Sequence, residues 1–265
     1  EQLLTENLMR NSDTKENNSR LLNYKKPQVE EPTLSSTVYD LLSKKSEKVD
    51  SSTMRSVSLV PEKILDAPEL RDDYYLNLMD WSPSGQLGIG LNNTIYLYTP
   101  AEISELCRLE EGYVCSISFQ PHSQMVAIGN SLGNIELYDV ERRALVRTLR
   151  GHMNRVSSLS FSSLLYSGSK DTLIHGYDIK AANPIVMRLE GHRGEVCGLK
   201  QSPSGLASGS NDNLAMVWDI NMGRVRHTLS GHKAAVKAIA WCPWQRNLLA
   251  TGGGTTDKSM RFWNV

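Results

Sequence analysis

A short module recurs three times at a spacing of forty residues, and this repeat restricts the chain to a repetitive fold. Each copy opens with the pair Gly-His, at residues 151–152, 191–192 and 231–232. Each copy also places an Asp six residues before an aromatic residue. These pairs are Asp171 with Tyr177, Asp212 with Trp218, and Asp257 with Trp263. Features that keep the same register in three copies indicate a true structural repeat rather than chance.

One copy, residues 191–220, contains three short apolar runs separated by turns of small residues. The runs lie at 196–199, 206–208 and 214–218, and each has the length of a buried strand. Three such strands between an opening Gly-His and a closing Trp-Asp predict one blade of a β-propeller of the WD-repeat type. We therefore expect an all-β WD-repeat propeller.

The same pattern divides residues 76–265 into five blades. The predicted strands are 76–82, 85–90 and 94–98; 114–119, 125–129, 135–140 and 144–149; 156–161, 164–169, 173–179 and 185–189; 196–199, 206–208, 214–218 and 225–229; and 236–241, 248–252 and 259–265. A further strand is predicted at 56–60, because propellers often complete the last blade with an N-terminal strand. We expect a fragment of a seven-bladed ring, and a five-bladed ring closed by residues 56–60 is the alternative.

Polar residues at fixed positions in blade four predict a buried hydrogen-bond chain. They are His192, Ser208, Asp212 and Trp218. A buried polar group without a partner costs about 1–3 kcal/mol, so such groups are expected to pair with one another. We therefore interpret His192, and likewise His152 and His232, as structural residues rather than as catalytic groups or metal ligands.

Composition excludes several classes of function. The net charge is 0, with 29 basic and 29 acidic residues, which argues against nucleic acid as a partner. The four cysteines include no Cys-x-x-Cys pair, so we expect free thiols and no metal site. The sequence shows no signal peptide and no long apolar span, so we expect no membrane partner and a location in nucleus and cytoplasm.

Residues 1–55 differ from the rest and are predicted to be a flexible N-terminal arm, whereas 56–265 form the propeller. The arm is rich in Ser, Asn, Lys and Glu, with Tyr24 and Tyr39 as its aromatics, so it has little apolar surface to bury. Within it, Lys15, Glu16 and Asn17 form the tripeptide that ubiquitin ligases read as a degradation signal. These residues are either a degron of the protein itself or a solvated polar stretch.

An acidic segment precedes the first blade. Asp66, Glu69, Asp72 and Asp73 lie within eight residues of one another, and Pro68 stiffens the chain between them. The segment is either a solvated linker or a surface that accepts a basic peptide side chain through charge-assisted hydrogen bonds.

Four stretches resemble the Fizzy family, the coactivators and substrate adaptors of the anaphase-promoting complex. The first, residues 63–81, reads KILDAPELRDDYYLNLMDW. The others are GHRGEVCGLK at 191–200 with NDN at 211–213, AVKAIAWCPWQ at 235–245, and TGGGT at 251–255. The resemblance covers residues 63–265 and, weakly, 19–27.

The resemblance implies a binding protein without catalytic residues or cofactors. It would present cell-cycle proteins for ubiquitination by reading short degrons. The implied partners are subunits of the anaphase-promoting complex, degron-bearing proteins such as cyclins and securin-type substrates, and checkpoint inhibitors. The family's N-terminal Asp-Arg-Tyr-Ile-Pro box and C-terminal Ile-Arg tail do not occur in this sequence, which leaves ligase activation open.

The resemblance also implies two degron sites. The positions that match the family's Lys-Glu-Asn site are Asp73, Asn211, Asn213 and Thr255. Carboxamides and a hydroxyl suit the Glu and Asn of that degron, and a carboxylate suits its Lys. Asn211 and Asn213 also flank Asp212 in a tight turn, where Asn is common for local reasons, but the resemblance favours recognition.

The second site would hold the destruction box, an Arg-x-x-Leu motif, in a groove between the first and last blades. Asp66, Pro68 and Glu69 match it, and Asp66 or Glu69 would pair with the Arg. Three other hypotheses remain. They are a generic WD-repeat scaffold that does not read degrons, an enzyme, for which no nucleophile–base pair or metal spacing is present, and self-inhibition through residues 15–17.

Overall fold

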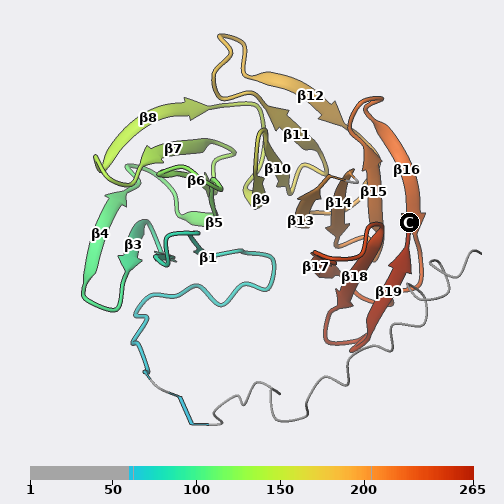
Figure 1. Ribbon diagram of the computed structural model, residues 1–265, viewed down its shortest axis with the longest axis horizontal. Coiled ribbons are helices and arrows are strands. Elements are labelled where there is room, and N and C mark those ends of the chain that lie inside the picture. Colours follow the sequence, from blue (N-terminus) through green and yellow to red (C-terminus); the bar gives the residue numbers. More distant parts are fainter. Residues whose placement is uncertain (1–59, 62, 204) are drawn as a thin grey trace, which may run out of the picture. The chain divides into compact units, whose positions relative to one another are not determined.

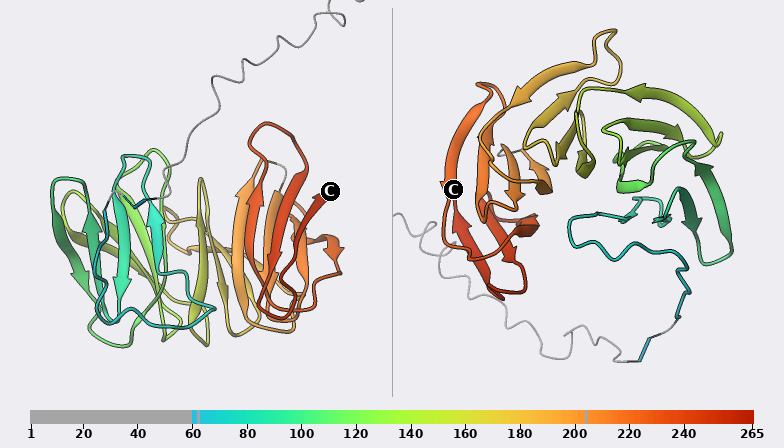
Figure 2. Two further views of the ribbon diagram at one scale, coloured as in Figure 1. Left: turned by 90° about the horizontal axis from the view of Figure 1, so that it is seen from below. Right: turned by 180° about the vertical axis from the view of Figure 1, so that it is seen from behind.

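The computed structural model of the chain describes residues 60, 61, 63–203 and 205–265. Residues 64–265 form one compact unit. This unit consists of five antiparallel sheets, or blades, arranged along an open arc (Figure 1). In every blade each strand pairs with the next in sequence. The left view of Figure 2 shows the arc from below, with the strands of the blades running roughly parallel to one another.

The strands are numbered in chain order. Blade one contains β1 (Met79–Trp81), β2 (Leu87–Leu91), β3 (Thr94–Tyr98) and β4 (Ile103–Arg108); blade two contains β5 (Val114–Phe119), β6 (Met125–Asn130), β7 (Ile135–Asp139) and β8 (Ala144–Leu149); blade three contains β9 (Val156–Phe161), β10 (Leu165–Ser169), β11 (Ile174–Tyr177) and β12 (Ile185–Leu189); blade four contains β13 (Val196–Ser202), β14 (Gly205–Ser210), β15 (Ala215–Asp219) and β16 (Arg224–Leu229); and blade five contains β17 (Val236–Trp241), β18 (Leu248–Gly253) and β19 (Met260–Asn264). The first strand of each blade lies on the inside of the arc, as Figure 1 shows.

The predicted all-β propeller fold is confirmed, and blades two to five match their predicted strands closely. Blade one was predicted less well. Strand β4 was not predicted, because its residues alternate between exposed and partly buried and include a single buried side chain, Leu106. The strand predicted at 76–82 is shortened to β1, because the residues before Met79 contact other blades instead. The predicted arm and nearly all of the predicted strand 56–60 lie outside the described residues, and Val60 belongs to no strand.

Glycines in the second strands set the spacing between neighbouring blades. A Cβ atom on Gly129 would approach Val156 to 2.9 Å, and one on Gly168 would approach Val196 to 2.5 Å. The same contact joins Gly90 to Val114 of the next blade, where a Cβ would lie at 2.7 Å. Close-packed interiors do not absorb such overlaps. Each glycine therefore lets the first strand of the next blade pack directly on the sheet, and an apolar core forms at each junction.

The hydrogen-bond chain expected in blade four is present and complete. The indole N–H of Trp218 donates to Ser208 Oγ at 2.7 Å, and Ser208 Oγ lies 2.7 Å from His192 Nε2. His192 Nδ1 lies 2.9 Å from Asp212 Oδ2. Blade five repeats the arrangement around His232, with Thr251 in place of the serine. Each histidine ring thus has both nitrogens occupied, which agrees with a structural role.

Candidate functional site

A single segment, residues 65–77, contributes to both predicted sites and is called the strap below. It precedes β1 and runs past blade one into the interior of the arc, as the blue-green trace in Figure 1 shows. Its first part, residues 66–72, is exposed, whereas Leu76 is buried with 4% of its surface accessible. The strap is therefore anchored at its C-terminal end and open to solvent at the other.

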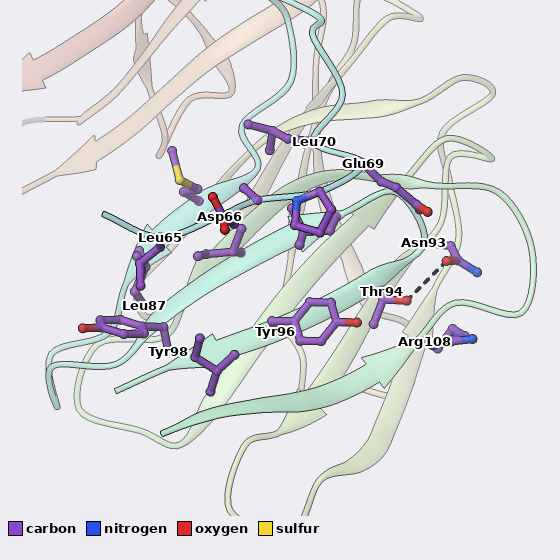
Figure 3. A pocket seen from close by; sticks show the side chains of 16 residues that line it. Leu65, Asp66, Glu69, Leu70, Leu87, Asn93, Thr94, Tyr96, Tyr98 and Arg108 are labelled. Carbon is purple, nitrogen blue, oxygen red and sulfur yellow. Dashed lines mark hydrogen bonds between the residues drawn. The ribbon is translucent and has the colours of Figure 1, made fainter. Parts of the chain in front are cut away.

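The first part of the strap covers one face of blade one and forms a pocket of about 610 Å³, called the apolar pocket. In β2 the glycines Gly88 and Gly90 face blade two. Successive residues of a strand point to opposite faces, so the alternating residues Leu87, Ile89 and Leu91 face the other way. These side chains, together with Tyr96 and Tyr98 of β3, line the pocket beneath the strap (Figure 3).

All the residues predicted for the destruction-box site line the apolar pocket. They are Asp66, Pro68 and Glu69. The pocket therefore combines two carboxylates on the strap with an apolar floor, which suits a ligand with one cationic and one aliphatic side chain. Arg108 of β4 also lines it, so the pocket contains charges of both signs.

The strap bends sharply where it contributes Glu69. Pro68 and Glu69 are the central residues of a turn in which the Leu70 N–H donates to the Ala67 carbonyl at 3.4 Å. Glu69 has φ 61°. A proline followed by a positive φ marks a type II turn, whose third position favours Gly or Asn. A glutamate held in this conformation is strained, and such strain concentrates at binding sites.

The C-terminal part of the strap forms a second pocket with blades four and five. This pocket has a volume of about 380 Å³ and is called the polar pocket. Its lining residues are Tyr74, Tyr75, Asn211, Asn213, Lys233, Ala234, Ala235, Gly254, Thr255 and Thr256. Three of the four residues predicted to read a Lys-Glu-Asn degron therefore lie together, and the turn after β18 brings Thr255 to the two asparagines.

The asparagines are positioned by the turn that contains Asp212. The Asp212 carboxylate accepts the backbone N–H of Arg193 at 2.9 Å and that of Leu214 at 3.0 Å, besides its contact with His192. Burial raises the pKa of Asp212, but these hydrogen bonds to the charged form outweigh burial, so the net pKa lies below the usual value. The buried chain of blade four therefore fixes the turn from which Asn211 and Asn213 project.

Comparison with known proteins shows the family to which the chain belongs. The family model described as "CDC20/Fizzy WD40 domain" matches residues 65–265. The chain belongs to the CDC20/Fizzy WD40 family. It is 46% identical over 221 residues to the "Anaphase-promoting complex subunit cdc20" of Dictyostelium discoideum, covering 80% of this chain and 44% of that protein.

Further relatives of the family agree. The "WD repeat-containing protein slp1" of Schizosaccharomyces pombe is 43% identical over 217 residues, which cover 80% of this chain and 44% of that protein. A chain in the solved structure "Crystal Structure of Mitotic Checkpoint Complex" superimposes with a TM-score of 0.75 at 41% identity, covering 80% of this chain and 69% of that chain. The chain spans less than half the length of these two curated relatives.

Asp73 occupies a different place from the other predicted Lys-Glu-Asn residues of this CDC20/Fizzy chain. It is not among the residues that line the polar pocket. Its Oδ2 forms an ion pair with Arg155 at 2.6 Å, and its Oδ1 accepts the Tyr75 N–H at 3.0 Å. Burial raises the pKa of Asp73, whereas the Tyr75 N–H and Arg155 lower it, with a net lowering. The carboxylate is thus already engaged within the protein.

Four residues at or beside these pockets were missed by the sequence analysis. Tyr74 and Tyr75 line the polar pocket, and the Tyr75 hydroxyl donates to Asn211 Oδ1 at 2.7 Å. Arg155 pairs with both Asp73 and Glu195. A signal for the Arg155–Glu195 pair was available, because the two residues occupy the same position of successive repeats, each just before a Val, and have opposite charge.

The cysteines and the potential metal ligands of the chain have the following arrangement. Within residues 60, 61, 63–203 and 205–265, no cluster of three or more His, Cys, Asp or Glu side chains is arranged to hold a metal ion. All four cysteines are free, and burial raises the pKa of the Cys115 and Cys197 thiols to about 12, so both are protonated at neutral pH. None of the described residues forms a helix that could span a membrane.

Proposed function

We propose that this chain is the degron-reading part of a substrate adaptor of the anaphase-promoting complex, and that it binds proteins rather than catalysing a reaction. Its partners would be subunits of that complex and cell-cycle proteins that contain a Lys-Glu-Asn box or a destruction box. Checkpoint proteins are proposed as further partners, because a similar chain occurs in a mitotic checkpoint complex. The proposed location is the nucleus and cytoplasm.

The observation that carries the proposal is the composition of the polar pocket. Two carboxamides and the Thr255 hydroxyl meet there on rigid turns, and both Asn211 and Thr255 are exposed. An amide offers donors and an acceptor, and a hydroxyl offers both. A peptide Glu and Asn would find complementary partners without large rearrangement of the turns. Rigid polar groups lose little entropy when they bind a ligand.

The apolar pocket supports the same function through different chemistry. Its floor of aliphatic and tyrosine side chains suits the Leu of a destruction box, and the carboxylates of Asp66 and Glu69 suit the Arg. An apolar pocket with a few polar groups at its edge is the usual form of a ligand site. We propose that each pocket takes one of the two degron types.

The test is a titration of the full 265-residue chain with a labelled Lys-Glu-Asn peptide. We expect a dissociation constant in the micromolar range, which corresponds to a binding free energy of about −8 kcal/mol. The affinity of Asn211→Ala/Asn213→Ala should be lower by about tenfold or more, because this variant loses two or three polar contacts. Asn221→Ala is the matched control, because Asn221 is an exposed Asn of blade four that lies outside the polar pocket.

Two results would contradict the proposal. Equal binding of the Lys-Glu-Asn peptide and a peptide with Ala at all three positions would favour a generic WD-repeat scaffold. Equal affinity of wild type and the Asn211→Ala/Asn213→Ala variant would show that the peptide binds elsewhere. Retained affinity in Asn221→Ala is required before the loss in the double variant is assigned to the pocket.

A further inference from the structure

The strap leads into blade one and contacts each of blades two to five. Three of these contacts use the same position of the repeat. This position is the residue just before the Val that opens the first strand, and it is Tyr113, Arg155, Glu195 and Ala235 in blades two to five. The Arg71 guanidinium lies 3.7 Å from the centre of the Tyr113 ring. Asp73 pairs with Arg155, and the Tyr74 hydroxyl donates to the Ala235 carbonyl at 3.3 Å.

The centre of these contacts is an ion-pair cluster in which Glu195 is buried, Arg155 is largely buried and the Asp73 side chain is 32% exposed. The Arg155 Nε and one terminal nitrogen donate to the two carboxylate oxygens of Glu195 at 2.7 and 2.9 Å, and its other terminal nitrogen reaches Asp73 at 2.6 Å. The side chains of Arg155 and Glu195 are only 13% and 6% exposed. Ser157 Oγ also donates to Glu195. A guanidinium held at three points is rigid, because its donors form a fixed planar fork.

The end of the strap is fixed across the arc by two further residues. The Asn77 side-chain amide donates to the carbonyls of Ser157 at 2.7 Å and Cys197 at 2.9 Å, in blades three and four. Lys237 of blade five donates to the Leu76 carbonyl at 2.7 Å. The strap is therefore held by hydrogen bonds and an ion pair from Asp73 to Asn77, whereas residues 66–72 are exposed.

One continuous segment thus lines both pockets. Residues 65–70 form one side of the apolar pocket, and Tyr74 and Tyr75 form one side of the polar pocket. Asp73 lies between these parts and is the point at which the strap meets the Arg155–Glu195 pair. A ligand at either end therefore contacts the same continuous segment, so each ligand can bias the position of the strap that the other ligand meets.

We propose that the strap couples the two pockets, so that a ligand in one raises the affinity of the other, and that Arg155 is the positioning residue for this coupling. The inference rests on the proposed function, since it takes degron peptides as the two ligands. Arg155 acts through Asp73 and does not itself line either pocket. The effect is reciprocal, because each ligand must change the affinity of the other by the same factor.

The coupling is tested by titrating the full chain with the Lys-Glu-Asn peptide in the absence and presence of a saturating destruction-box peptide on a separate molecule. We expect the affinity to rise by about fivefold, at the lower end of allosteric couplings, and the reverse titration to give the same factor. If both peptides bind and neither changes the affinity of the other, the coupling is refuted and the proposed function stands. If neither peptide binds, the coupling and the proposed function are both refuted.

The role of Arg155 is tested with Arg155→Lys, which keeps the charge but loses the three-point fork. We expect the coupling factor to fall towards one, while Arg226→Lys, an exposed arginine on β16, keeps it. Partial unfolding would reduce the number of binding sites but not the ratio of two affinities in the folded fraction. An unchanged coupling factor in Arg155→Lys would overturn the role of Arg155.

A direct role of Asp73 in peptide binding predicts a different result and is separated by a double-mutant cycle. Asp73→Asn removes the carboxylate that meets Arg155 and leaves the buried Arg155–Glu195 pair in place. The cycle combines it with a peptide whose Lys is replaced by Met. If Asp73 acts only through the strap, the two changes are additive and Asp73→Asn abolishes coupling. Non-additive changes with unchanged coupling would overturn the positioning role.

Discussion

Blades three and four hold a histidine in the same way but differ in what surrounds it. In both, the His after the opening Gly lies between an Asp and a Ser, with ring-nitrogen distances of 2.8 and 2.7 Å in blade three and 2.9 and 2.7 Å in blade four. These residues are His152, Asp171 and Ser167 in blade three, and His192, Asp212 and Ser208 in blade four.

The difference begins beyond the serine. In blade four the Trp218 indole completes the chain. In blade three Tyr177 takes the Trp position, and a second histidine, His175, stacks on His152 with the ring centres 4.2 Å apart and the planes 11° apart. Met216 occupies the position of His175 in blade four.

The exposed turns of the two blades differ as well. The Asp is flanked by Asn211 and Asn213 in blade four but by Lys170 and Thr172 in blade three. Each Asp is held by its His, so the turn geometry is preserved while the exposed side chains change. The comparison shows that the buried frame and the recognition surface are set by different residues, and each part can be altered separately.

The largest effect is expected from a substitution that disrupts the buried hydrogen-bond chain of blade four. Trp218 is packed in the core with only 1% of its surface exposed. Trp218→Phe removes the donor to Ser208 and leaves a cavity, so we expect the free energy of unfolding to fall by about 2–3 kcal/mol. Tyr177→Phe should lower the free energy of unfolding by less than about 1 kcal/mol, because it keeps the ring and removes only the hydroxyl. This hydroxyl lies 3.3 Å from His175 Nδ1 and also interacts with Ser167. Urea denaturation of the two variants measures the difference. Equal losses would show that the indole hydrogen bond contributes nothing specific.

The next prediction concerns stability at acidic pH and the second histidine of blade three, His175. Burial and the neighbouring His152 lower the pKa of His175 to about 4 from its usual 6.5, although Asp171 opposes this and Arg188 adds to it. Between these values the unfolded chain binds a proton that the folded chain does not, so stability falls as the pH decreases from 6.5 to 4. His175→Met introduces the residue found at this position in blade four. It should therefore make the protein more stable than wild type at a pH of about 5, by about 2 kcal/mol.

The control for this prediction is the same measurement at a pH of about 7.5. There His175 is neutral, as Met is, so the stability of His175→Met should exceed that of wild type by much less. The carboxylate of the same blade acts at lower pH. Burial raises the pKa of Asp171, but His152 and the Met153 N–H lower it to about 2. Its stabilising contribution is lost only as the pH falls from about 4 towards about 2. If the difference in stability between wild type and His175→Met were the same at both pH values, the lowered pKa of His175 would be contradicted.

The frame could be predicted from the sequence, whereas the strap could not. The repeat fixes where Gly, His, Asp and the aromatic residues lie, and the period of forty residues places them in equivalent positions in each blade. The contacts of the strap depend on closing loops of more than eighty residues, such as Asp73 to Arg155 and Tyr75 to Asn211. Local patterns contain no information about such pairs. Family resemblance supplied Asn211, Asn213 and Thr255 but gave no reason to separate Asp73 from them.

The smallest effect concerns the exposed turn, where the backbone conformation is shared and the residues differ. Thr172 and Asn213 have φ 73° and 67°, a region that Asn adopts readily and a β-branched residue rarely does. Thr172→Asn should therefore stabilise blade three by about 0.5–1 kcal/mol, and Asn213→Thr should destabilise blade four by a similar amount. Thermal unfolding of both single variants measures this. If Asn213→Thr weakened the Lys-Glu-Asn peptide while stability stayed unchanged, Asn213 would be present for recognition alone. A loss of stability with full affinity would assign it to the turn.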